Sequence, residues 1–575
     1  MYWSCDFETT TDPDDVRVWA WGAYEIFTEK FEYGTDIDGF MRFMFQMERP
    51  LMSFHNEKFD GEFIFNWLLR HGYKHTQKRK LLENQFQTLI SEAGQFYTIT
   101  IALPSHNKKG KSVNRCIIYD SLKKLPFSIK SIAKAFKMDV RKGEIDYRKL
   151  RPVDYKMDEN ELSYLYRDCK IAGDALRIQI SEGYDRITVG SDALHTFQEM
   201  FGGKKKFRKT FPVLPAEVDK FIRNAYKGGW TYLKEPGVVY DGDVYDVNSL
   251  YPWAMYDNLL PYGYPIYFKG KYKPSDNYPL YMQCFSCSFE IKPGYLPTVQ
   301  IKHSIFYQGN QYLERSKADV VLYMTNVDLE LFLDHYEVYN LQYIDGFKFR
   351  AKAGFFHEYI DHFMQIKATS DGALRTLAKL MLNSCYGKFA TRIDVRGKYP
   401  VLGEDGTIHY QRTDPEEREP IYTPLACFVT AWARNKTIRT AQQVYDDFIY
   451  ADTDSIHMRH RDSVPFTVHK SDLGAWKHES HFYKAKFIQQ KRYIEVMEIT
   501  EEDYHKAEQD PDFENNLMTE NGKFYEVNIK CAGMPAEAKR KVSFENFEIG
   551  LTLVRLHPVH RPGGLVLEER EFTLQ

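Results

Sequence analysis

The sequence is poor in cysteine and lacks long apolar runs. Only 8 of its 575 residues are cysteine, and they are scattered. Cys284 and Cys287 form a lone C-x-x-C with no second cysteine pair or histidine nearby, which argues against a zinc site. A reduced, cytosolic chain fits this cysteine usage better. No run of about 18 apolar residues occurs, so we expect no membrane span.

An excess of charge of one sign is also missing. The formal net charge is −3, so the total charge does not indicate a nucleic-acid-binding protein. Local basic patches do occur, at Lys78–Lys80, Lys108–Lys111 and Lys204–Lys209, and such runs either contact phosphate or are merely solvated. The N-terminus, Met1 to Glu8, has acids where a secretion signal has Lys or Arg, so we expect no such leader.

Aromatic residues are abundant, with 41 Tyr, 40 Phe and 8 Trp. Core packing explains most of them, and base stacking is the other use of such rings. A prior of about 150 residues per domain suggests roughly four compact units, and no repeat or low-complexity segment is visible. The patterning predicts strands at Cys5–Glu8 and Val244–Val247, and helices at Glu161–Ile180 and across 355–390. It also predicts a β-hairpin at 392–423, a strand pair around Tyr450–His457, and short strands beyond 532.

Asp6 and Glu8 lie two residues apart on an expected strand. Side chains repeat every second residue along a strand, so both carboxylates point to one face. Adjacent carboxylates repel unless a cation neutralises them, and hard oxygen ligands suit magnesium or manganese. Alone, this pair is also explained by a solvated strand face.

Two later segments add to this pair. Asp60 lies just before an apolar, helix-like run, and Tyr164 and Asp168 lie four residues apart on one expected helical face. Together the segments supply four carboxylates and a hydroxyl that can orient a water. This inventory suits phosphodiester hydrolysis by two divalent metals about 3.5–4 Å apart.

The order of these segments resembles the three exonuclease motifs of DnaQ-type proofreading nucleases. The resemblance implies that Tyr164 orients the attacking water and that Asn56 and Phe59 hold the frayed 3′ end. It implies metal-binding roles for Asp6, Glu8, Asp60 and Asp168. The stretch Tyr119–Pro126 resembles a segment of polymerase exonucleases that contacts single-stranded DNA, with Ser121 and Leu122 as the contacts.

A second set of acids lies far along the chain. Asp246 opens the stretch Asp246–Pro252 after a β-like run, and Tyr450–Ser455 predicts a hairpin with acids at its tip. Between them, a helical pattern places Lys379, Asn383 and Tyr386 on one face, which Arg375 extends by one turn. A cationic face with one ring can hold a triphosphate and stack on its base, although a salt-bridging face is the simpler interpretation.

Together these segments resemble the palm and fingers motifs of family B DNA polymerases. The patterns D-x-x-S-L-Y-P, K-x-x-x-N-S-x-Y-G and Y-x-D-T-D-S are all complete. The resemblance implies that Asp246, Val247 and Asp454 bind the catalytic metals and that Asp452 supports them. It implies that Lys379 contacts the phosphates and can protonate the leaving pyrophosphate, and that Tyr251 rejects ribonucleotides. The implied nucleotide-binding residues are Val247, Tyr251, Lys367, Lys379, Asn383 and Tyr386.

Further segments resemble DNA-binding motifs of the same group. Tyr226–Gly229 resembles the Y-x-G-G motif that balances synthesis and editing. The implied DNA contacts here and downstream are Tyr226, Gly228, Gly229, Thr430, Arg434, Lys491, Tyr493 and Lys530. In two places the fingers helix departs from the usual pattern: Cys385 stands where an aliphatic residue is common, and Arg375 where a Lys is often found.

The whole chain resembles the protein-primed DNA polymerases of small tailed bacteriophages, which replicate linear genomes from a terminal protein. The implied fold is multidomain, α/β and α+β, with a DnaQ-like (RNase H-like) exonuclease and a right-hand polymerase carrying two insertions. The implied domains are exonuclease 1–188, palm 189–257 and 424–531, first insertion 258–354, fingers 355–391, second insertion 392–423 and thumb 532–575. In that group the first insertion docks the terminal protein, and the second closes around DNA and supports processivity and strand displacement.

The resemblance also implies cofactors, partners and a place of action. We expect two Mg²⁺ ions per active site, replaceable by Mn²⁺. The expected partners are primer–template DNA, dNTPs, a terminal protein and a single-strand DNA-binding protein. We expect a monomer in the cytoplasm of an infected bacterial host. The alternatives are a DNA-binding replication scaffold derived from a polymerase, and a nuclease alone. The first should have lost carboxylates, and the second leaves Lys379–Gly387 and the pair Asp246 and Asp454 unexplained.

Overall fold

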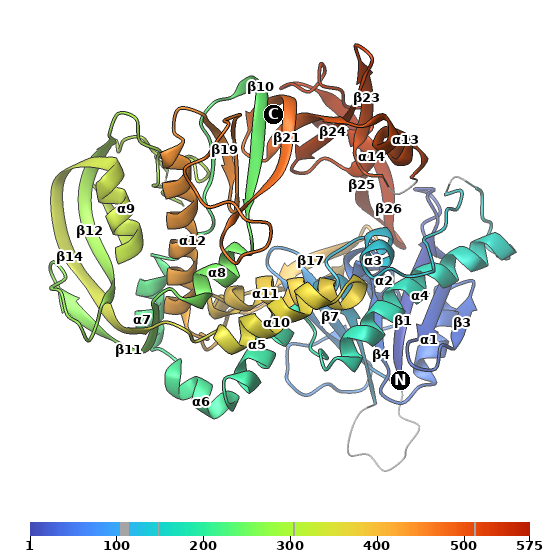
Figure 1. Ribbon diagram of the computed structural model, residues 1–575. Helices are drawn as coiled ribbons and strands as arrows, with labels where there is room; N and C mark the ends of the chain where they lie inside the picture. The colour runs from blue at the N-terminus through green and yellow to red at the C-terminus, as the bar shows by residue number, and fades with distance from the viewer. Residues whose placement is uncertain (104–113, 148, 303–304, 511–512, 575) are drawn as a thin grey trace.

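The computed structural model describes residues 1–574 except 104–113, 148, 303–304 and 511–512. Figure 1 shows an N-terminal α/β unit beside a second sheet-based unit, with helices between them and a third small sheet at the far side. The basic patch at Lys108–Lys111 lies outside the described residues. Within the described part of the chain, no helix is both long and apolar enough to cross a membrane.

The N-terminal unit is built on a sheet of strand order β17-β16-β6-β7-β8-β4-β1-β2-β3, with β5 beside β6. Its strands are β1 (Tyr2–Thr9), β2 (Val18–Glu25), β3 (Phe31–Gly34), β4 (Leu51–Phe54), β5 (Lys74–His75), β6 (Gln85–Ser91), β7 (Phe96–Ala102), β8 (Arg115–Asp120), β16 (Gly397–Leu402) and β17 (Ile408–Arg412). Its helices are α1 (Ile37–Phe45), α2 (Glu57–Arg70), α3 (Ile129–Ala135) and α4 (Glu159–Ser181), with a 3₁₀ turn at Ser121–Lys123.

The two elements expected in this unit are confirmed. The strand at Cys5–Glu8 lies within β1, which runs parallel to β4 and antiparallel to β2. The helix at Glu161–Ile180 lies within α4. A capping box between Asp158 and Glu161 stabilises the N-terminus of α4. The position of Asp60 differs from the expectation: it does not precede a helix but lies in the first turn of α2. Asn56, at φ 77°, turns the chain so that the helix begins at Glu57.

The second unit is a sheet of strand order β23-β24-β22-β21-β10-β20-β19-β9. Its strands are β9 (Thr231–Leu233), β10 (Gly237–Val247), β19 (Phe448–Asp452), β20 (Ser455–Arg459), β21 (Trp476–Gln489), β22 (Arg492–Ile499), β23 (Asn516–Glu520) and β24 (Lys523–Cys531). The expected hairpin around Tyr450–His457 is confirmed as β19 and β20, and the expected strand at Val244–Val247 ends β10.

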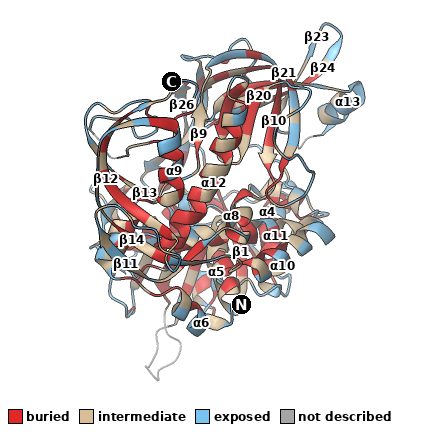
Figure 2. Ribbon diagram, turned by 60° about the vertical axis from the view of Figure 1, so that its left-hand side comes forward, coloured by how far each residue is buried: buried red, intermediate tan, exposed pale blue. Residues whose placement is uncertain are grey.

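Helices join the two units. They are α5 (Val189–Met200), α6 (Gly203–Thr210), α7 (Ala216–Arg223), α8 (Leu250–Tyr256), α10 (His357–Thr369), α11 (Gly372–Phe389) and α12 (Thr423–Gln443). The expected helical stretch at 355–390 is therefore two helices, α10 and α11, broken at Ser370 and Asp371. Figure 2 shows α12 with its length largely buried, and its residues Leu425–Val429 and Ala431 belong to an apolar core that α11 also enters.

The segment 258–354 forms a sheet of its own. Its strands β11 (Leu260–Lys269), β14 (Tyr336–Lys352), β12 (Leu280–Ile291) and β13 (Val320–Thr325) lie in that order, with α9 (Asn326–His335) packed on them. The lone C-x-x-C lies in β12, where both cysteines are free and buried in the sheet. The segment thus has its own apolar core, centred on Phe285, Phe289 and Phe332.

The expected hairpin at 392–423 is confirmed, but it is not an isolated module. Its main strands β16 and β17 extend the N-terminal sheet, because Gly397 and Lys398 of β16 pair with Ser91 and Ile90 of β6. A second, short pairing joins β15 (Asp394–Val395) to β18 (Glu416–Glu417).

The C-terminal segment also differs from the short strands that the sequence suggests. It forms one long hairpin, β25 (Thr552–Arg561) and β26 (Gly564–Thr573), after the short helix α14 (Ala536–Lys539). The helix α13 (Glu501–Gln509) precedes β23. The hairpin tip reaches the N-terminal unit, where a Cβ on Gly564 would lie 2.4 Å from the ring of Phe63 on α2. Figure 1 shows this hairpin descending onto α2.

Candidate active sites

Three elements bring the N-terminal carboxylates together. Strand β1 supplies Asp6 and Glu8, the first turn of α2 supplies Asp60, and α4 supplies Asp168. All four line one cavity of about 650 Å³. Other predicted residues that line it are Tyr164, Asn56 and Phe59. The cavity also receives Pro558, Leu565 and Leu567 from the C-terminal hairpin, so residues from opposite ends of the chain form its wall.

The electrostatics of this cavity indicate a place for cations. Burial and the charge of Asp168 raise the pKa of Asp6 to about 7. Burial and neighbouring acids also raise the pKa values of Glu8 and Asp60 well above their ordinary range. The Oδ1 atom of Asp168 is buried without a hydrogen-bond partner. Clustered carboxylates with an unpartnered oxygen fit divalent metal ligands, because a bound cation would neutralise the repulsion.

Lys142 and Tyr147 belong to this site, and the sequence reasoning missed both. The Nζ atom of Lys142 lies 2.8 Å from Asp168 Oδ2, and the Tyr147 and Tyr164 hydroxyls lie 2.8 Å apart. Burial lowers the pKa of Lys142, but Asp168 and Asp6 outweigh it and the net shift is upward. No local signal marks Lys142, because it lies in a segment without regular structure between α3 and α4.

The second pair of acids meets in the other sheet. Asp246 lies opposite Ser455 in the β10–β20 ladder, and the Val247 N–H donates to the Asp454 carbonyl oxygen over 2.8 Å. Asp246 and Asp454 are thereby brought together, although they lie 208 positions apart in the sequence. The pKa of Asp246 is raised to about 7, mainly by burial and further by the charges of Asp454 and Glu479. Burial also raises the pKa of Asp454. Glu479, an exposed acid of β21 that the sequence reasoning missed, lies near enough for its charge to act on Asp246.

Three cations of α10 and α11 lie near one another, and the charge of one of them, Lys367, reaches Asp246. Burial and the nearby charges of Lys379 and Arg375 lower the pKa of Lys367, whereas Asp246 raises it. Lys367 Nζ donates to Ser249 Oγ over 3.1 Å, which places it beside the D-x-x-S-L-Y-P turn. Lys379 and Asn383 on α11 are exposed. The predicted face of α11 is therefore available to an anion beside the two acids.

Four non-glycine residues at the two sites have a left-handed backbone conformation. Asn56, Ser249, Thr453 and Lys491 all have positive φ, between 57° and 77°. Ser249 follows Asp246 and begins α8, while Thr453 forms the turn between Asp452 and Asp454. Left-handed non-glycine residues cost free energy and persist where the surrounding structure fixes them.

The hairpin acid Asp452 has a partner of its own. Lys491 Nζ lies 2.9 Å from Asp452 Oδ1, and Thr231 Oγ1 donates to the same oxygen over 3.1 Å. This arrangement fits a supporting role for Asp452. The Y-x-G-G segment packs on the same turn, because a Cβ on Gly229 would lie 2.6 Å from Thr453 Oγ1.

Four of the residues predicted to contact DNA have no accessible side chain in this conformation. They are Ser121, Thr430, Arg434 and Tyr493. Arg434 forms a buried ion pair with Asp328, at 2.8 Å, and donates to the carbonyl oxygens of Lys227 and Gly228. A DNA contact through these four residues therefore stays a prediction. In this conformation Arg434 holds the Y-x-G-G segment in place.

The other predicted contacts lie nearer the surface. Asn56, Gly228, Lys491 and Lys530 are exposed, and Phe59, Leu122, Tyr226 and Gly229 are partly exposed. Thr430 is buried on α12 between Val429 and Ala431, which belong to an apolar core. Tyr493 stacks on Phe487 with ring centroids 5.4 Å apart. Burial of this kind depends on tertiary packing, which a motif does not reveal.

A family model agrees with this arrangement. The model for type B DNA polymerases of organelles and viruses matches residues 44–473. The chain belongs to the type B DNA polymerases. The DNA polymerase of Bacillus phage phi29 is 47% identical over 100% of this chain and 99% of that protein. The DNA polymerase of Streptococcus phage Cp-1 is 33% identical over 100% of this chain and 98% of that protein.

Solved structures match over the whole chain as well. The phi29 DNA polymerase in complex with primer–template DNA and incoming nucleotides is 45% identical, with a TM-score of 0.92 and 100% of both chains covered. The same enzyme with single-stranded DNA gives a TM-score of 0.90 at 43% identity, again with both chains fully covered. The multidomain fold with an exonuclease domain, palm, fingers and thumb is thus confirmed, and the chain is a DNA-directed DNA polymerase of the phi29 type.

Proposed function

We propose that this polymerase edits its own product, with synthesis at Asp246 and Asp454 and 3′–5′ exonucleolytic removal at the N-terminal cavity. The observation that carries the proposal is the convergence of two separate carboxylate centres on two different sheets. Selection of a nucleotide by binding alone is limited, so a second site that removes errors extends fidelity. Two opposing reactions need two sites.

Both sites have the ligands for divalent metals. At each, two Mg²⁺ ions, which Mn²⁺ can replace, would activate the attacking oxygen and neutralise the leaving one. The residues that would hold them at the polymerase site are Asp246, Asp454 and the main chain of Val247. At the exonuclease site they are Asp6, Glu8, Asp60 and Asp168.

At the polymerase site the protein side chains position the nucleotide. Lys367, Arg375 and Lys379 form a cationic group that balances the triphosphate. Lys379 can also protonate the leaving pyrophosphate. Tyr251 lies where a 2′-hydroxyl would sit, and Tyr386 stacks near the new pair while Asn383 shapes the pocket. Positioning of this kind supplies most of the catalysis in phosphoryl transfer.

At the exonuclease site Tyr164 and Lys142 act on the attacking water and the scissile phosphate. The Tyr164 hydroxyl is held by Tyr147 and directed to the carboxylates, so it can orient a water. Lys142, paired with Asp168, brings a positive charge to the place where negative charge develops. Asn56 and Phe59 at the cavity wall hold the unpaired 3′ end.

Reciprocal variants test the division of labour. Asp454→Ala should abolish primer extension in Mg²⁺ and leave degradation of single-stranded DNA intact, and Asp6→Ala with Glu8→Ala should do the reverse. Loss of a metal carboxylate is expected to cost several kcal/mol, where each ~1.4 kcal/mol is tenfold in rate. If each variant, still folded by circular dichroism, lost both activities together, the proposal of two independent sites would fail.

We also propose that this polymerase starts from a terminal protein and proceeds by strand displacement. The likeness to phage polymerases over the whole chain and the two insertions support this. The second insertion and the C-terminal hairpin both meet α2: Arg70 Nη2 donates to the Gly406 carbonyl oxygen over 3.2 Å, and Gly564 packs on Phe63. These contacts close a ring of elements that would keep hold of DNA during processive synthesis.

Covalent labelling tests the priming step. With its cognate terminal protein, Mg²⁺ and radioactive dATP, the enzyme should transfer a dAMP moiety to a hydroxyl of that protein. Absence of labelling, with normal extension of a DNA primer, would refute protein priming and leave the polymerase assignment untouched. In this proposal the enzyme works as a monomer in the cytoplasm of the infected bacterium, beside a single-strand DNA-binding protein.

A further inference from the structure

A buried carboxylate lies at the centre of three histidines in the palm sheet. Asp243 on β10 accepts hydrogen bonds from His460 Nδ1 at 2.7 Å, His478 Nε2 at 2.8 Å and His481 Nδ1 at 3.2 Å. Asp243 is only 3% exposed. Burial raises the pKa of Asp243, but these three hydrogen bonds outweigh it and hold the pKa below its ordinary value. Asp243 is therefore a fixed negative charge that the histidines surround.

The hydrogen bonds to Asp243 decide the tautomer of two of the rings. His460 and His481 both direct Nδ1 at the Asp243 carboxylate, which can only accept hydrogen bonds, so Nδ1 carries the proton in both rings. In a neutral ring the lone pair then lies on Nε2. A metal-binding histidine has this arrangement, with one ring nitrogen held by a carboxylate and the other free for the metal.

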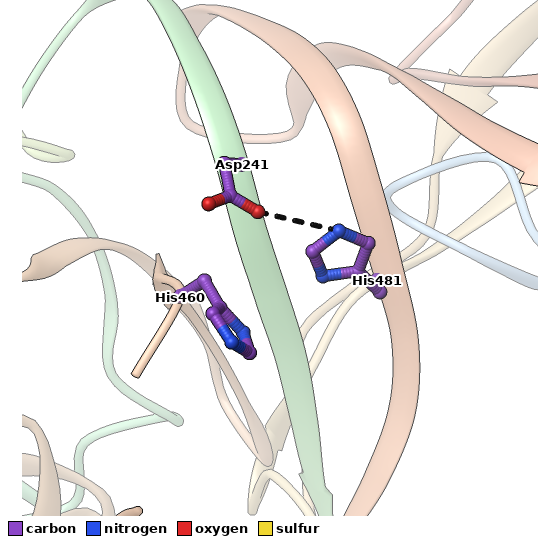
Figure 3. A group of neighbouring side chains, drawn as sticks. All are labelled: Asp241, His460 and His481. Carbon is purple, nitrogen blue, oxygen red and sulfur yellow. Dashed lines mark ion pairs between the residues drawn. The ribbon is translucent and has the colours of Figure 1, made fainter. Parts of the chain in front are cut away.

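A second carboxylate, that of Asp241, lies beside the outer nitrogen of His481 and close to the His460 ring. Asp241 Oδ1 lies 3.3 Å from His481 Nε2, and the His460 N–H donates to the Asp241 carbonyl oxygen over 2.9 Å. Asp241, His460 and His481 each have one potential ligand atom, and these three atoms lie within 4.8 Å of one another. Figure 3 shows the Asp241 carboxylate directed at the His481 ring, with His460 on the neighbouring segment below them. Among the described residues, no other group of three His, Cys, Asp or Glu side chains is this close.

We propose that Asp241, His460 and His481 bind a single Zn²⁺-class ion, with Asp243 as the carboxylate that orients the two histidines. Two imidazoles and one carboxylate are a common ligand set for this class, with water in the fourth position. Mg²⁺ and Ca²⁺ prefer oxygen ligands alone, so the site is distinct in chemistry from the two carboxylate centres. Tetrahedral binding needs ligand atoms roughly 3.4 Å apart, so an ion would have to draw the three exposed side chains together from their present separation of up to 4.8 Å.

The location suggests what the ion does. Asp241 belongs to β10, His460 directly follows β20, and His481 belongs to β21, so one ion ties three neighbouring strands. Asp243 precedes catalytic Asp246 by three residues, about 10 Å along the strand, so the ion takes no part in nucleotide transfer. It would instead fix the strands that carry Asp246 and, through the β19–β20 turn, Asp454. The inference concerns metal-dependent stability and adds to the proposed function without resting on it.

Binding of Zn²⁺ to the full-length enzyme tests the site. The protein is stripped with a chelator, supplied with Mg²⁺ in excess to occupy the carboxylate centres, and titrated with ZnCl₂ in equilibrium dialysis. His460→Asn with His481→Asn removes two ligands whose side chains are 44% and 46% exposed, so the fold should survive. His505→Asn is the matched control, an exposed histidine beside Glu508 on α13.

The wild type and the control should bind one more Zn²⁺ than the double variant, whose affinity should fall at least 100-fold. Zn²⁺ should raise the unfolding midpoint of the wild type and the control, and leave that of the double variant unchanged. Asp243→Asn should weaken binding about 10- to 100-fold, as for other partners of metal-bound histidines. Equal stoichiometry and affinity in the wild type and the double variant would overturn the proposal, and the histidines would then be only ion-pair partners of Asp243.

Discussion

Tyr251 and Tyr386 stack with their ring centroids 4.1 Å apart and their planes within 18°. Tyr251 lies in the first turn of α8, five residues after Asp246, and Tyr386 lies on α11 seven residues after Lys379. The stack therefore joins α8, which follows the turn after Asp246, to α11, which carries Lys379. It forms a flat wall at the place where the sugar of an incoming nucleotide is expected.

Replacement of Tyr251 should relax the choice of sugar. In Tyr251→Val the wall loses a ring, which leaves space for a 2′-hydroxyl. We expect the preference for dNTP over NTP, as a ratio of kcat/KM, to fall by about one to two orders of magnitude. Single-nucleotide incorporation assays measure both constants. Tyr386→Phe keeps the stacked ring and is the control. An unchanged ratio in Tyr251→Val would show that another residue excludes the 2′-hydroxyl.

Position 229 should tolerate no side chain unless the Thr453 side chain moves. A Cβ there would lie 2.6 Å from Thr453 Oγ1 and 2.7 Å from its Cγ2, whereas a Cβ at Gly228 would meet nothing within 4 Å. Gly229→Ala should therefore displace the turn between Asp452 and Asp454 and reduce primer extension at least tenfold, with single-strand degradation retained. Because Thr453 has φ 65°, glycine suits that position, and Thr453→Gly should restore extension in the Gly229→Ala background. Failure of that rescue would place the defect elsewhere.

Lys142 should matter to degradation and not to synthesis. In Lys142→Ala, Asp168 loses its 2.8 Å ion pair and the cavity loses one of the two lysines that line it. We expect the rate of single-strand degradation at saturating Mg²⁺ to fall tenfold or more, with primer extension within twofold of the wild type. Lys134→Ala, at an exposed position of α3, is the matched control. Equal degradation rates in the two variants would remove Lys142 from the site.

Glu62 should make stability depend on pH near neutrality. Its Oε1 accepts the Tyr410 hydroxyl at 2.6 Å, and burial raises its pKa from 4.5 to about 7. The folded state thus holds a proton that the unfolded chain releases above about 4.5. The stability due to Glu62 therefore falls as the pH rises from about 4.5 to about 7, and stays low above that.

Glu62→Gln removes that dependence. The unfolding midpoint of the variant relative to the wild type should rise across this pH window and level off above it. Calorimetry at fixed Mg²⁺ measures the midpoints, with the exposed Glu498→Gln as the control. A constant difference between variant and wild type at all pH values would contradict the protonation of Glu62 in the fold.

The motifs by themselves predict the chemistry of the two sites. The spacings Asp6 to Glu8, Tyr164 to Asp168 and Lys379 to Asn383 are local, and the periods of strand and helix translate them directly into shared faces. The strand at Cys5–Glu8, the helix at Glu161–Ile180 and the hairpin around Tyr450–His457 followed from the same local patterns. Such features depend on neighbours along the chain, and the sequence contains those neighbours.

Only the tertiary structure decided which distant residues join those acids and which are withdrawn from the surface. Lys142 and Glu479 reach the sites through loop conformation and strand register, and Arg434 is buried because Asp328 lies opposite it on α9. The pairing of β16 with β6 and the meeting of His460 and His481 at Asp241 likewise join segments tens to hundreds of residues apart. Contacts of this kind are set by packing of the whole chain, and no local period encodes them.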